Sequence, residues 1–64
     1  MTKEQILSLF RKGNSKAFII NLEFQDMKRS YHFPLIKERK ELMKKQAIKK
    51  IEEVLLEDWK NNFN

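Results

Sequence analysis

The chain has 64 residues, of which 41% are hydrophobic and 36% charged, with a formal net charge of +5 and no cysteine. A chain of this length forms one small domain, residues 1–64, and the lack of cysteine excludes disulfides and thiolate metal sites. The first residues lack the apolar core of a signal peptide, and no run of about 18 apolar residues predicts a membrane span. We therefore expect a cytoplasmic protein without a membrane-embedded part.

The first predicted element is a helix over residues 3–12. Thr2 and Gln5 have the spacing of a capping box, in which each side chain accepts a hydrogen bond from the backbone of the other residue. Gly13 follows the last turn, where glycine adopts the left-handed conformation that ends many helices. A helix of about ten residues is too short to persist alone in water, so we expect it to pack against the rest of the chain.

Two strands are predicted next, at residues 17–25 and 29–35. In the first strand, apolar residues occupy every second position from Phe18 to Phe24, which is the period of a strand with one buried face. The second strand also has apolar residues at alternate positions, and Pro34 indicates that it ends there or forms an open edge. A four-residue turn between the strands would make them an antiparallel hairpin.

The last predicted element is a long helix over residues 37–61. Apolar residues recur at steps of three and four from Met43 to Leu55, as in a helix that buries one broad face. Glycine and proline are absent from this stretch, and good helix formers fill most other positions. The rest of the chain is expected to pack against this helix.

Together these elements predict an α+β fold in the order helix, β-hairpin, long helix (αββα). Both helices would pack on one face of the two-stranded antiparallel hairpin, whose open edges favour pairing with a second copy. The predicted core consists of the apolar residues that face one another in this arrangement: Ile6, Phe10, Phe18, Ile20, Leu22, Phe33, Ala47, Ile51 and Leu55.

The charge is unevenly distributed along the predicted long helix. Residues 37–50 hold seven basic and two acidic side chains, whereas residues 51–64 hold one basic and four acidic ones, an order that opposes the helix dipole. This is compatible with a phosphate-bearing partner for the basic half, and a merely solvated charged face is the alternative interpretation. The candidate nucleic-acid-binding residues are Lys28, Arg29, Lys37, Arg39, Lys40, Lys44, Lys45 and Lys49.

A second apolar seam is predicted on the opposite side of the long helix. Its residues lie at multiples of seven positions, and they form a candidate surface for a homodimer or for another protein: Leu42, Leu56 and Phe63. Single apolar side chains are also common on protein surfaces, so an ordinary exposed position is the alternative interpretation.

The sequence shows no catalytic or cofactor motif. His32 is the only histidine, and the predicted hairpin places it opposite Glu23 as a charged pair on the outer face. Without a second histidine, a cysteine or a glycine-rich phosphate loop, we expect no enzymatic activity, no cofactor and no metal. The leading hypothesis is a small regulatory or accessory module of bacterial or phage type that binds nucleic acid. The alternative is an inhibitor or adaptor that acts as a homodimer or docks on a partner protein.

Overall fold

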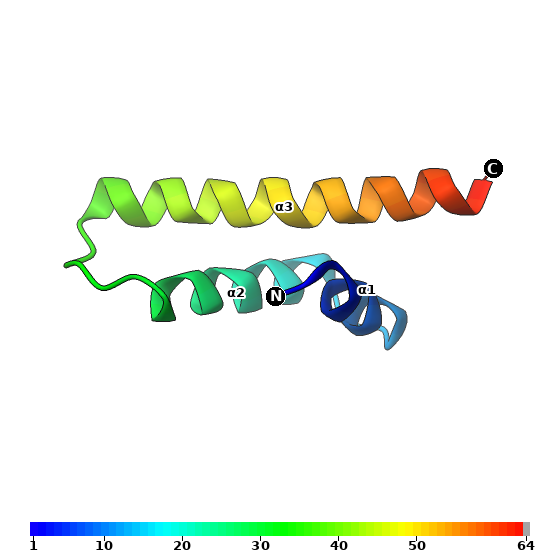
Figure 1. The fold of residues 1–64 in the computed structure, drawn as a ribbon, viewed down its shortest axis with the longest axis horizontal. Coiled ribbons are helices and arrows are strands. Elements are labelled where there is room, and N and C mark those ends of the chain that lie inside the picture. The colour runs from blue at the N-terminus through cyan, green and yellow to red at the C-terminus, as the bar shows by residue number, and fades with distance from the viewer. Residues whose placement is uncertain (64) are drawn as a thin grey trace.

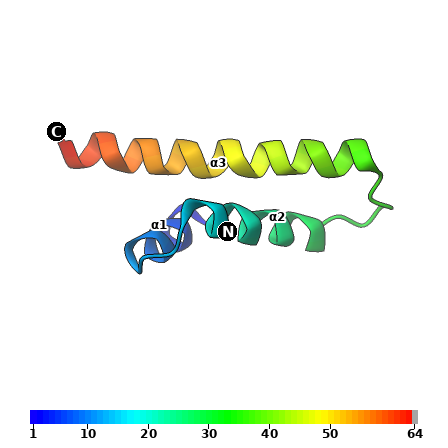
Figure 2. The same cartoon turned by 180° about the vertical axis from the view of Figure 1, so that it is seen from behind.

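The computed structural model describes residues 1–63, with side chains to residue 62. This part of the chain contains three helices: α1 (Lys3–Arg11), α2 (Lys16–Arg29) and α3 (Lys37–Phe63) (Figure 1). Helices α2 and α3 lie side by side and antiparallel, and α1 packs against both near the start of α2 (Figures 1 and 2). The described part is elongated, 43 Å in its longest dimension, because α3 alone has 27 residues.

The sequence signals at both ends of α1 are confirmed. The Thr2 hydroxyl accepts a hydrogen bond from the Gln5 backbone N–H at 3.2 Å, and the Gln5 side chain accepts one from the Thr2 N–H at 2.9 Å. After the last turn, Gly13 has a φ of +93° and donates its N–H to the carbonyl of Phe10 at 3.0 Å. The capping box and the left-handed glycine therefore define this helix locally.

The predicted hairpin, and with it the α+β fold class, is wrong. The expected first strand lies within α2, and no strand occurs in residues 1–63. Ser15 caps α2, because its hydroxyl accepts a hydrogen bond from the Phe18 backbone N–H at 3.1 Å. The expected second strand is divided between the end of α2 and the connection to α3, residues 30–36, which has no regular secondary structure.

A physical reason for this error is that the α2 sequence carries two periodicities. Apolar residues at every second position follow a strand period, but Ile19, Glu23 and Met27 also recur every fourth residue and share one helical face. A helix satisfies its backbone hydrogen bonds within the segment, whereas an isolated two-stranded hairpin is only marginally stable. Packing against α1 and α3 favours the helical period.

One apolar cluster joins the three helices. Ile6 of α1, Ile19 of α2 and Ile51 of α3 are completely buried and belong to a single core cluster. Leu7, Met43 and Ala47 are the other buried apolar residues of the described chain. The core is therefore small and lies where α1 crosses the pair of long helices.

The predicted core is confirmed in part. Ile6, Ala47 and Ile51 are buried, while Ile20, Leu22 and Leu55 are half-buried. Three aromatic residues assigned to the core are exposed: Phe10, Phe18 and Phe33. The hairpin assignment placed Phe18 and Phe33 on its inner face, and both lose that environment because no hairpin forms.

Candidate nucleic-acid interface

The acidic half of α3 is neutralised within the molecule. Three of its four carboxylates form ion pairs with basic side chains of α1 and of the first residue of α2. The nitrogen to oxygen distances are 2.6 Å for Lys3–Glu57, 3.2 Å for Arg11–Asp58 and 3.1 Å for Lys16–Glu52. These contacts explain why acidic residues lie toward the C-terminal half of α3, against the dipole preference. They bind α1 and the start of α2 to that half.

A buried carboxylate joins the N-terminus to α2 and α3. Glu23 is only 3% exposed, and its two oxygens accept hydrogen bonds from the Met1 amine and from Lys50 Nζ, each at 2.8 Å. Lys50 also donates to the Met1 carbonyl at 2.7 Å, and Asp26 forms a second ion pair with the Met1 amine. The sequence pattern did not predict this role for Glu23. An acidic residue on the apolar face of a helix would have indicated it.

The Met1 ion pairs change the titration of two groups. Hydrogen bonds to Asp26 and Glu23 raise the pKa of the Met1 amine above its usual value. The same amine lowers the pKa of the Asp26 carboxyl through its hydrogen bond and its charge. Both shifts favour the charged forms, so the cluster holds the start of the chain against α2 at neutral pH.

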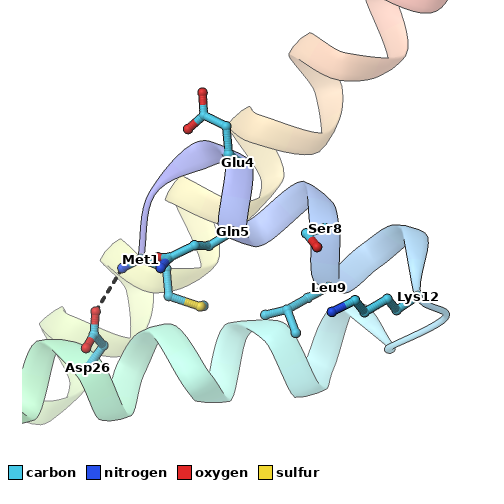
Figure 3. A pocket seen from close by; sticks show the side chains of 7 residues that line it. All are labelled: Met1, Glu4, Gln5, Ser8, Leu9, Lys12 and Asp26. Carbon is cyan, nitrogen blue, oxygen red and sulfur yellow. Dashed lines mark hydrogen bonds and ion pairs between the residues drawn. The ribbon is translucent and has the colours of Figure 1, made fainter.

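A hollow lies beside this cluster, between α1 and α2 (Figure 3). Its lining includes charged residues of both signs, since Glu4 and Asp26 line it together with Lys12. The polar residues Gln5 and Ser8 complete the side formed by α1. Because neither sign of charge dominates, this hollow has no strong preference for an anion or a cation.

The predicted nucleic-acid-binding residues extend from the other end of the α2 and α3 pair to the middle of α3. Because the two helices are antiparallel, the end of α2 and the start of α3 lie together around the connecting segment (Figure 1). We call these residues the basic end: Lys28, Arg29, Lys37, Arg39, Lys40, Lys44, Lys45 and Lys49. None of the eight forms an ion pair with the part of the chain that the structure describes.

The structure changes the expected setting of two members of the basic end. Lys28 and Arg29 were predicted at the tip of a hairpin turn, but they occupy the last turn of α2, where cations interact favourably with the helix dipole. Lys28 Nζ lies 5.0 Å from the centre of the Phe24 ring. The position of these cations next to the start of α3 therefore results from helix pairing.

The cations of α3 point in more than one direction. Lys45 and Lys49 lie one turn apart on the side opposite Ala47, which faces the core. Lys44 instead lines a groove between α2 and α3. The basic end is consequently a region of positive charge that surrounds the start of α3, with Glu38 and Glu41 as its acidic neighbours.

The expected pair of His32 and Glu23 is wrong. His32 is exposed in the segment between α2 and α3. Glu23 is buried, and its carboxylate accepts hydrogen bonds from the Met1 amine and Lys50. Within the described residues, no group of three or more His, Cys, Asp or Glu side chains is arranged to hold a metal ion.

Two of the three residues of the predicted apolar seam have described side chains. Leu42 and Leu56 are exposed on the outer side of α3, and the side chain of Phe63 lies outside the described part of the structure. Exposure does not by itself show that the seam binds a partner, so this role stays a prediction.

The sequence reasoning missed an apolar groove between α2 and α3. It has a volume of about 570 Å³, and its lining is formed mainly by apolar side chains of both helices: Ala17, Phe18, Ile20, Asn21, Phe24, Lys44 and Ile48. The helical period of α2 places Ile20 and Phe24 on this side, one turn apart. The predicted strand gave no sign of the groove, because it placed Ile20 and Phe24 on the buried face of a hairpin.

None of the helices in residues 1–63 has the length and apolar character needed to cross a bilayer. Comparison of the chain with protein-family models, curated proteins and solved structures gave no significant match. Residues 1–63 form a small three-helix fold with a cationic end where α2 and α3 are joined.

Proposed function

We propose that this protein is a small, non-enzymatic cytoplasmic accessory module that binds nucleic acid through its basic end. The observation that supports this proposal is that ion pairing differs between the acidic half of α3 and the basic end. Three ion pairs neutralise the acidic half of α3, whereas the eight cations of the basic end form no ion pair within the described residues. Unpaired, mostly exposed cations are available to replace the counterions of a phosphate backbone.

The types of residue indicate how such binding would work. Six of the eight cations are lysines, whose ammonium groups attract phosphates without the planar, two-pronged geometry that arginine uses to read guanine. The interface therefore favours affinity for the backbone over recognition of a base sequence. Binding should be fast, salt-dependent and tolerant of sequence.

The salt dependence of binding tests this proposal. If about five phosphates are contacted, a plot of log affinity against log salt should have a slope of about −4 to −5 on duplex DNA, a loss of several hundredfold between 50 and 200 mM. Fluorescence anisotropy with duplex and single-stranded oligonucleotides measures both affinity and slope. Absence of binding below about 100 μM protein at 50 mM salt would remove the proposal.

A matched pair of variants tests the location of the site. The double variant Lys45→Glu/Lys49→Glu reverses two exposed cations of the basic end, and Lys12→Glu/Lys60→Glu makes the same change in net charge elsewhere. The first should reduce the salt slope by about two and weaken binding strongly, while the second should leave the slope unchanged. Equal effects would show that net charge, rather than the basic end, attracts the ligand.

The apolar groove between α2 and α3 favours a second candidate function, self-association as a protein-interaction module. Among the described residues only three large side chains are completely buried, and domains of this size often gain stability from oligomerisation. A second copy seated in the groove would cover Phe18 and Phe24. Light scattering at high micromolar concentration tests this: a dimer that Phe18→Glu dissociates supports it, and a monomer leaves only a different protein as the partner.

A further inference from the structure

The connection between α2 and α3 presents aromatic rings at the basic end. Phe33 is 72% exposed, although a phenylalanine gains stability from burial. Its ring meets the Tyr31 ring edge to face, with centroids 5.9 Å apart and an interplanar angle of 63°. Tyr31 is half-buried and lines a hollow with Met43 and Lys50, so one ring is held against the fold and the other extends into solvent.

A cation lies next to the anchored ring. The guanidinium carbon of Arg39 is 6.0 Å from the centre of the Tyr31 ring. Lys37 begins α3 four positions after Phe33 in the sequence. Arg39, Tyr31 and Phe33 therefore form a continuous series in which a cation, an anchored ring and an exposed ring follow one another. Lys28 beside Phe24 repeats the combination of a cation and a ring at the end of α2.

Cations and aromatic rings placed together can bind the two parts of a single-stranded nucleic acid, its phosphates and its bases. Cations attract the phosphates, and an exposed ring stacks on an unpaired base, which every base allows because every base has an aromatic face. In a duplex the bases are stacked on one another and offer no free face to a side chain. The combination consequently favours single strands over duplexes.

We propose that the basic end binds single-stranded nucleic acid, with Phe33 as the ring on which an unpaired base stacks. Arg39 and Lys37 hold the neighbouring phosphates, and Tyr31 supports the Phe33 ring from its edge. This inference rests on the proposed nucleic-acid function and adds the class of ligand. Contact of the exposed Phe33 and Ile36 with a second copy is the alternative, and light scattering separates the two.

The test compares the full-length protein with Phe33→Ala and Phe33→Tyr. Anisotropy is measured on a labelled single strand of about 16 nucleotides and on its duplex, at two salt concentrations. Wild type should prefer the single strand. Phe33→Ala should weaken single-strand binding by about 5- to 150-fold with an unchanged salt slope, and Phe33→Tyr should retain it.

Phe10→Ala is the matched control, because it removes the same ring from an exposed position on α1. It should leave both affinities unchanged. Duplex binding equal to single-strand binding, with no effect of Phe33→Ala, would overturn this inference and leave the proposed function intact. No binding to either oligonucleotide would overturn both. Loss of a dimer in Phe33→Ala, seen by light scattering, would assign the ring to self-association and overturn the inference as well.

Discussion

Replacement of the buried carboxylate by an amide, Glu23→Gln, tests how the three helices are held together. The side chain keeps its size but loses the charge that faces the Met1 amine and Lys50 Nζ, both 2.8 Å away. The amide oxygen still accepts a hydrogen bond from one of the two cations. The amide nitrogen is itself a donor and cannot accept a hydrogen bond from the other cation. One charge-assisted hydrogen bond is therefore lost and the other is weakened.

The expected loss of stability is about 2 kcal/mol. Hydrogen bonds to charged groups contribute about 1.5–3 kcal/mol each, and removing one member of a buried ion pair costs about 3–5 kcal/mol. The figure for a single hydrogen bond applies, because the Lys50 side chain is 44% exposed and can turn into water when the carboxylate charge is lost. A 64-residue domain has about 3–10 kcal/mol in total, so the loss is large.

Urea unfolding followed by circular dichroism measures this loss. Asp26→Asn is the matched control, because it removes a carboxylate that binds the same Met1 amine from an exposed position. It should lower the free energy of unfolding by clearly less than Glu23→Gln does. If both variants unfold at the same urea concentration as wild type, the carboxylate does not join the helices and the interpretation of the cluster is wrong.

Three further predictions concern stability. Ile51→Ala should cost about 2–5 kcal/mol, while the same change at the exposed Ile36 should stay within about 0.5 kcal/mol, and equal urea midpoints would remove Ile51 from the core. Gly13→Ala should cost about 1–2 kcal/mol in the same assay because φ is +93°, although no atom lies within 4 Å of the added Cβ, and an unchanged midpoint would contradict the strain argument. Ion pairing raises the pKa of the Met1 amine and lowers that of Asp26. Stability should therefore fall above about pH 8, as the amine deprotonates, and below about pH 4, as the carboxyl protonates; a flat pH profile of the urea midpoint would contradict this.

The sequence by itself determined the elements whose signals are local. Thr2 and Gln5 bond to each other's backbone across three residues, and Gly13 ends the helix through its own conformation, so both could be recognised without knowledge of the fold. The long helix was equally clear, because a period of three and four residues persisted from Met43 to Leu55. The concentration of basic residues between 37 and 50 was also evident from the order of residues alone.

The tertiary structure decided the conformation of residues 16–29. That segment carries apolar residues at both a strand period and a helix period, and only the surfaces of α1 and α3 select between them. Ile19 is buried because Ile6 and Ile51 meet it in the core. Glu23 is tolerated in the interior because Met1 and Lys50, 22 and 27 residues away, supply its counter-charges.

The candidate site also depended on contacts distant in the sequence. Composition counts the charges but does not show which of them are paired. The ion pairs that neutralise the acidic half of α3 join residues 36, 47 and 54 positions apart. Because such pairs form only after the helices have packed, the tertiary structure alone separates the cations that hold the fold together from those at the basic end.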